Sequence, residues 1–213
     1  MRLVFTRVAI AASLAAGAIA LNFATRADPN APAPTAKPAP AGKADKGGPA
    51  DLGAMSDRDA LARLKAEAGT WDVAMSLWFG PSAEPVTTKA TLTAAMTLGG
   101  MYLEQRFEGV GLGPKLPDLK WTSLSYTGYN ATTRQYEAVR MASTQSTMII
   151  VRGPMNADGS MELSGDYTLM GMKSTQRDVI THQGPDSERI ESWMTFGDNP
   201  EFKGAEMVLT RRK

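Results

Sequence analysis

The chain has 213 residues, of which 23 are basic and 22 acidic, and it contains one histidine and no cysteine. A nearly neutral chain without a basic stripe offers nucleic acid little to bind, so we expect no nucleic-acid partner. The lack of cysteine excludes disulfides, and the folded part of the chain must therefore be held together by its own core.

The N-terminus has the layout of a secretory signal peptide. Arg2 and Arg7 precede an uninterrupted run of apolar and small residues from Val8 to Leu21, and Ala18-Ile19-Ala20 fits a cleavage site. An uncleaved anchor is the weaker alternative, because this run is shorter than the roughly 20 residues that span a bilayer. We expect a signal peptide over residues 1–27, a periplasmic or secreted protein, and no membrane span after cleavage.

A change of composition follows the predicted signal peptide. Residues 28–50 are rich in proline, alanine, glycine and lysine and have almost no large apolar side chain. Such a segment cannot bury enough surface to offset its chain entropy, so we predict a disordered linker. The remaining residues, 51–213, suffice for one domain with a substantial core.

The predicted domain begins with a short helix. Ser56 is a plausible N-cap, and Leu61, Leu64 and Ala68 follow at spacings that place them on one apolar face. Gly69 then ends the helix as a C-cap residue. A single helix before an all-β pattern could plug one end of a barrel.

After this helix the apolar residues alternate with a period of two, which is typical of β-strands. Ten such segments are separated by turn residues: 70–79, 84–98, 101–108, 120–129, 133–142, 145–152, 160–169, 173–183, 188–196 and 202–212. Tight turns indicate antiparallel neighbours. We predict an all-β, ten-stranded antiparallel up-and-down barrel, with a two-sheet sandwich as the alternative. A barrel of this width is expected to hold an internal cavity.

Several short motifs occur in an order that resembles a known family. They are Gly69-Thr70-Trp71-Asp72-Val73, Leu98-Gly99-Gly100-Met101-Tyr102-Leu103-Glu104-Gln105, Thr127-Gly128-Tyr129-Asn130, Arg177-Asp178-Val179, and Glu201-Phe202-Lys203 with Thr210-Arg211. Together they resemble the bacterial domain-of-unknown-function family numbered 1579, from about residue 61 to the C-terminus. The resemblance implies a bacterial source and a calycin-like, lipocalin-like barrel with no assigned activity.

The alternation along the strands predicts which side chains face the lumen. If Trp71 faces inward, the candidate ligand-binding residues are Met75, Leu77, Phe79, Leu103, Gln105, Phe107, Arg177 and Met207. Gln105 is a polar group among apolar ones, and buried polar groups need partners. Arg177 fits an inward or a surface position equally well. Trp71 and Arg211 are expected to close one end of the barrel through a cation–π contact.

Catalytic and metal chemistry find little support in the sequence. His182 is the only histidine and lies beside a predicted turn, where a histidine is usually solvated. Haem ligation by His182 is an alternative, since a related class of ten-stranded barrels binds haem through a late histidine. A zinc site would need more nitrogen or sulfur ligands. Glu104, Glu108 and Asp178 are expected to face water. We therefore predict no catalytic residue, metal or cofactor.

The many methionines and the wide barrel favour a binding function. Thirteen methionines fill irregular apolar space, and copper(I) binding by their thioethers is the alternative. We expect a small apolar or amphipathic ligand in a pocket of about 300–1,000 Å³, within a monomer or weak homodimer. The alternatives are an enzyme acting on a lipophilic metabolite and a non-catalytic envelope scaffold. Two or more ionisable groups that converge on the pocket would favour the enzyme. A lumen fully packed with side chains would favour the scaffold.

Overall fold

The computed structural model describes residues 57–169 and 171–213, so the predicted signal peptide and linker lie outside the described residues. The elements are α2 (Asp57–Ala66), β1 (Gly69–Leu77), β2 (Val86–Thr97), η1 (Leu98–Gly100), β3 (Tyr102–Val110), β4 (Lys120–Asn130), β5 (Gln135–Ala142), β6 (Ile149–Gly153), β7 (Met161–Leu169), β8 (Met172–Gly184), β9 (Ser187–Phe196) and β10 (Phe202–Arg211). The ten strands predicted from the alternation are all present.

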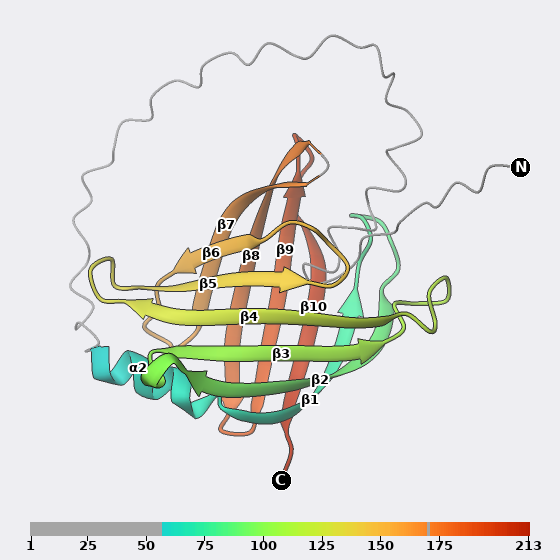
Figure 1. Cartoon of the computed structure of the whole chain (residues 1–213). Coiled ribbons are helices and arrows are strands. Elements are labelled where there is room, and N and C mark those ends of the chain that lie inside the picture. The colour runs from blue at the N-terminus through green and yellow to red at the C-terminus, as the bar shows by residue number, and fades with distance from the viewer. Residues whose placement is uncertain (1–56, 170) are drawn as a thin grey trace, which may run out of the picture.

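The ten strands form a closed antiparallel barrel. Each strand pairs with its neighbours in the chain, and β1 also pairs with β10, with Trp71 opposite Arg211. Strands β3–β5 run across strands β7–β9, which lie behind them in Figure 1. The barrel prediction is confirmed and the sandwich alternative is wrong. Closure leaves no sheet edge exposed, which removes a route to aggregation.

Several strands begin one to four residues later than the sequence pattern predicts, and for β2 and β6 the difference has a clear local cause. Strand β2 begins at Val86, directly after Pro85, which has no amide hydrogen to donate to a ladder. Strand β6 begins at Ile149 because the chain before it turns. There the backbone N–H of Gln145 donates to the backbone carbonyl of Ala142 at 3.2 Å.

Helix α2 packs against one end of the barrel (Figure 1). Its apolar residues Ala60 and Leu64 are fully buried. The Tyr136 hydroxyl donates to the Ala60 carbonyl at 3.3 Å, and Arg63 Nη2 donates to the Gly159 carbonyl at 3.4 Å. The helix therefore closes this end, and it places the residues that follow it next to the lumen.

Apolar side chains on the inward faces of the strands form the core of the barrel. At the end opposite α2 it contains buried apolar side chains that include Leu77, Leu112, Trp121, Phe196 and Phe202. The rings of Phe196 and Phe202 lie 6.1 Å apart between centroids. Among the described residues, no helix has the length and apolar character needed to cross a membrane.

Candidate functional site

A cavity of about 60 Å³ lies inside the barrel. Its lining residues are Leu64, Glu67, Met75, Gln105, Phe107, Trp121, Ser123, Ser125, Thr127, Arg140, Met161, Leu163, Ile180, Glu188, Ile190, Ser192 and Met207. The prediction of an internal cavity is confirmed, but the predicted size of about 300–1,000 Å³, taken from the usual range of small-molecule sites, is wrong, because large side chains occupy much of the lumen. Trp121 and Phe107 narrow it from one wall and three methionines narrow it from the other.

The two walls of the cavity differ in polarity. Strands β3, β4 and β5 contribute most of its hydroxyl, amide and guanidinium groups. Strands β7, β8, β10 and β1 contribute only apolar side chains, and β9, between β8 and β10, adds Glu188 and Ser192 to that wall. Gln105 lies opposite Ser125 in the ladder, and Ser125 lies opposite Arg140, so these three form one polar row. The Ser125 hydroxyl is buried and has no hydrogen-bond partner within the described chain. The row therefore presents unused hydrogen-bonding capacity to the cavity.

The structure separates the residues that the sequence places in the lumen. Those that line the cavity are Met75, Gln105, Phe107 and Met207. Three others belong to the packed core and do not reach the cavity: Leu77, Leu103 and Phe79. Leu77 and Phe79 lie at the end of the barrel away from α2, where the apolar cluster fills the space.

Arg177 lies outside the lumen, so the inward orientation considered for it is wrong. Its guanidinium donates to both carboxylate oxygens of Glu201, at 2.9 and 2.7 Å, and lies 5.4 Å from the centre of the Trp193 ring. The inward positions of β8 are instead those on either side, Gln176 and Asp178, which are both fully buried.

Asp178 was expected to face water, and this expectation is also wrong. Its carboxylate is fully buried and forms an ion pair with Arg140, which reaches it from β5 on the other side of the lumen. Gln176 Nε2 donates to its two oxygens at 3.0 and 3.1 Å, and the Ser192 hydroxyl donates at 2.5 Å. Three neighbours thus satisfy a charge that has no access to solvent.

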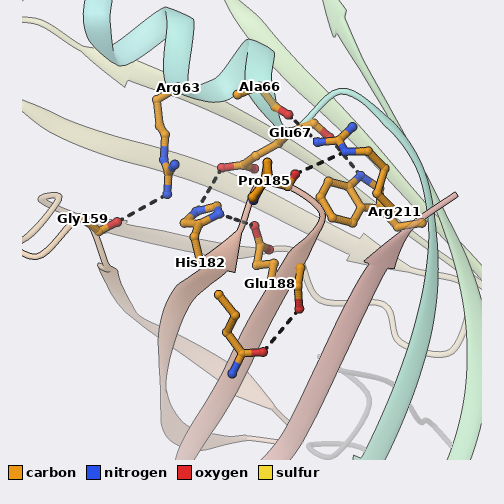
Figure 2. A network of polar contacts seen from close by, with 11 residues as sticks. Arg63, Ala66, Glu67, Gly159, His182, Pro185, Glu188 and Arg211 are labelled. Atoms are coloured by element: carbon orange, nitrogen blue, oxygen red, sulfur yellow. Dashed lines mark hydrogen bonds and ion pairs between the residues drawn. The ribbon is translucent and has the colours of Figure 1, made fainter. Parts of the chain in front are cut away.

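Trp71 and Arg211 meet at the end of the barrel covered by α2. The guanidinium carbon of Arg211 lies 4.0 Å from the centre of the Trp71 ring, and Trp71 is 3% exposed. Arg211 also donates to the carbonyls of Ala68 and Ala66, both at 2.6 Å. Figure 2 shows the bond to Ala66. A Cβ at Gly69 would lie 2.5 Å from Arg211 Nη1, and φ there is +143°, so only glycine fits.

His182 lies between two buried carboxylates beneath α2, so its expected solvation is wrong (Figure 2). Its Nδ1 is 3.4 Å from Glu188 Oε2, and its Nε2 is 3.9 Å from Glu67 Oε1. The β8–β9 ladder places His182 directly opposite Glu188. Glu67 comes from the segment between α2 and β1, and its backbone carbonyl accepts the Trp71 indole N–H at 3.0 Å.

The two carboxyl groups have strongly perturbed acidity. Burial, followed by the charge of Glu188, raises the pKa of Glu67 to about 8. Burial raises the pKa of Glu188 to about 7, against the opposing effect of Arg63 and Arg211. Both groups line the cavity together with Arg140. Carboxyl groups that exchange protons near neutrality can act as acids or bases, or they can hold a cation.

The chain can now be placed among known proteins. A family model described as protein of unknown function (DUF1579) matches residues 57–211. The chain belongs to the DUF1579 family. The match runs from the start of α2 to the end of β10, so the DUF1579 domain is the whole barrel with its helix. The family resemblance drawn from the sequence motifs is confirmed.

Solved structures share the fold of this DUF1579 domain. An S-type phycobiliprotein lyase, CPES from Guillardia theta, is 14% identical, with 76% of this chain and 96% of that chain covered and a TM-score of 0.53. Rv2717c from M. tuberculosis is 16% identical, with 72% of this chain and 98% of that chain covered and a TM-score of 0.54. Both are calycin-like barrels, and at this identity the likeness concerns the fold alone. No curated protein matches the chain.

Sequence reasoning missed the polar groups that give this DUF1579 lumen its character. One signal was available. The predicted turn at Gly184-Pro185-Asp186 implies that His182 and Glu188 face each other across a hairpin. Glu67 carried no such signal, because its place beside them depends on how α2 docks. The pairing of Arg140 with Asp178 likewise spans the lumen and follows only from barrel closure.

Proposed function

We propose that this DUF1579 protein binds a small amphipathic molecule inside its barrel. The observation that carries the proposal is the gathering of hydroxyl, amide and guanidinium groups on β3–β5, opposite a wall that is apolar apart from Glu188 and Ser192 of β9. Small-molecule sites are mostly apolar, with a few polar groups that fix the orientation of the ligand. A ligand with an apolar body and a hydroxyl or carbonyl group would match both walls at once.

The polar row of Gln105, Ser125 and Arg140 supplies the recognition. The Ser125 hydroxyl has no partner among the described residues, and an unpaired buried hydroxyl costs about 1–3 kcal/mol. A guanidinium has five N–H donors, and the ion pair with Asp178 engages Nη1 of Arg140. Donors therefore remain for an oxygen of the ligand.

The size of the cavity limits the ligand. About 60 Å³ accepts only a small molecule unless the lining moves. The lining contains Met75, Met161 and Met207, and the unbranched thioether of methionine adapts to irregular shapes. Longer ligands would therefore be accepted only as far as these side chains can rearrange.

A series of primary alcohols from butanol to octanol, measured by calorimetry, tests this proposal. Each added methylene should improve affinity by about 0.8 kcal/mol, which is close to fourfold, until the chain fills the cavity. Phe107→Ala should move this limit to longer alcohols, because Phe107 lines the cavity. Phe79→Ala is the matched control and should leave the limit unchanged, because Phe79 packs outside the cavity. The absence of saturable binding, or equal shifts in both variants, would contradict the proposal.

Catalysis on a lipophilic metabolite is the second candidate, and the convergence of Glu67, Glu188 and Arg140 on the cavity favours it. Two carboxyl groups with pKa values near neutrality suit general acid–base chemistry. A serine nucleophile is not assembled within the described residues, where His182 contacts the two glutamates. Turnover of a lipophilic substrate that is lost in Glu188→Gln but kept in Glu191→Gln would support the enzyme.

We further propose that the protein works in the periplasm or outside the cell. The support is the basic start of the chain and the apolar run from Val8 to Leu21. N-terminal sequencing of protein exported by a bacterial host should find a mature terminus between about residues 21 and 28. Exported protein that begins at Met1 would contradict this.

A further inference from the structure

Three donor groups from three segments converge beneath helix α2. Glu67 follows the helix, His182 lies near the end of β8 and Glu188 lies at the start of β9. One ligand atom from each of them lies within 4.8 Å of the other two. Figure 2 shows the imidazole held between the two carboxylates. The three donors are therefore close enough to share one ion.

Two atoms of this cluster lack the partners that buried polar atoms normally have. Glu67 is 8% exposed, and its Oε1 is buried without a hydrogen bond to any described residue. The same holds for Nε2 of His182. These two atoms are 3.9 Å apart, which is too far for a hydrogen bond. An occupant between them would satisfy both.

The nearby cations do not fill this space. Arg63 donates to the carbonyl of Gly159, and Arg211 donates to the carbonyls of Ala66 and Ala68. Both guanidinium groups act on the glutamates only through their charge. Carboxyl groups buried this deeply are costly to ionise without a cation beside them, so a bound metal ion would take the place of their protons.

We infer that Glu67, His182 and Glu188 bind a divalent transition-metal ion. Zinc lies about 2.0–2.2 Å from imidazole nitrogen and carboxylate oxygen, so tetrahedral ligands are separated by about 3.4 Å. The 3.9 Å between His182 Nε2 and Glu67 Oε1 needs only a small closing movement of flexible side chains. Glu188 now contacts the other ring nitrogen, Nδ1, and its carboxylate must turn toward Nε2 to bind the same ion. The inference is independent of the proposed ligand-binding function.

The donor set indicates the class of ion. Imidazole suits zinc and its first-row neighbours, whereas sites for magnesium and calcium are built from oxygen ligands. Three protein ligands leave a fourth position open, as in sites where the metal also binds water. Glu67 and Glu188 line the cavity, so this open position faces the lumen. The sequence-based objection to zinc counted only nitrogen and sulfur ligands, and the carboxylates supply what it lacked.

The test uses the full chain without an affinity tag, freed of metal with EDTA and titrated with zinc chloride by calorimetry. We expect one site with a Kd of about 10 μM or less, and no comparable binding of magnesium. Glu67→Gln and Glu188→Gln should each weaken zinc binding at least about tenfold. Glu191→Gln is the matched control, because Glu191 is on the same strand but pairs with Lys203, and it should bind zinc as the wild type does.

A second measurement does not depend on any variant. His182 is the only histidine, so a chain labelled with ¹⁵N-histidine reports on this site alone. Zinc at one equivalent should shift the resonance of one ring nitrogen of His182. The inference is overturned if zinc does not bind stoichiometrically, or if it binds while the histidine resonances stay in place. Equal zinc affinity of the wild type and both Gln variants would overturn it as well.

Discussion

Replacing Arg140 by methionine should destabilise the barrel strongly, because it leaves a buried charge without its counter-ion. Arg140 is the cationic partner of Asp178, whose side chain is 0% exposed. Methionine keeps most of the length and the apolar stem of arginine, so the change removes chiefly the guanidinium. Gln176 and Ser192 still donate to the carboxylate in the variant, but neither carries a charge.

The expected loss in the free energy of unfolding is about 3–5 kcal/mol, the usual cost of removing one partner of a buried ion pair. Much of this is the penalty of an uncompensated carboxylate rather than the net worth of the pair. Removing both charges in Arg140→Met/Asp178→Asn should therefore recover a large part of the loss. Asparagine can still accept the hydrogen bonds from Gln176 and Ser192.

Urea denaturation at pH 7 measures these differences, and Arg177→Met provides the control. Arg177 is an arginine on the strand that carries Asp178, and its ion pair with Glu201 is at the surface, with side chains 28% and 40% exposed. Such pairs contribute about 0–1 kcal/mol. The reasoning is refuted if Arg140→Met costs no more than Arg177→Met, or if the double variant is less stable than the single one.

Two further predictions concern the end of the barrel beneath α2. Trp71→Ala should lower the free energy of unfolding by about 3–5 kcal/mol, and Arg211→Met should lower it by about 0.5–2 kcal/mol. Urea titrations measure both losses, and a smaller loss for Trp71→Ala than for Arg211→Met would contradict this order. The pKa of Glu67 is raised from 4.5 to about 8, so the folded state holds an extra proton between these values. In EDTA, stability should therefore fall as the pH rises through this window, and Glu67→Gln should flatten the fall. Parallel pH profiles of wild type and variant would count against it.

The fold was predictable because one face of most strands is consistently apolar. Trp71, Met75 and Leu77 alternate with Asp72 and Ser76, and this pattern alone assigns the inner face of β1. Turn residues then fix the antiparallel connections, and the number of strands favours closure.

The inner face of β8 could not be assigned in the same way. Ser174, Gln176 and Asp178 face inward while Thr175 and Arg177 face outward, so both faces of the strand carry polar residues. An alternation rule has nothing to act on when neither face is apolar. Asp178 lies inside because Arg140, Gln176 and Ser192 satisfy its charge there, and only the closed barrel brings those groups together.

The site beneath α2 likewise could not be predicted without the tertiary structure. The hairpin after β8 is visible in the sequence, and it brings His182 opposite Glu188. Glu67 reaches them only because α2 docks through Ala60 and Leu64 on the barrel end. The sequence of a short helix does not show where the helix will pack, so this convergence could be seen only in the structure.

A crystal structure of the protein soaked with its tightest-binding primary alcohol tests the central claim most directly. We predict one alcohol molecule in the lumen, with its hydroxyl against Gln105, Ser125 or Arg140 and its chain against Met161 and Met207. An alcohol found only on the outer surface, with the lumen closed by its own side chains, would contradict the claim that this barrel binds an amphipathic ligand.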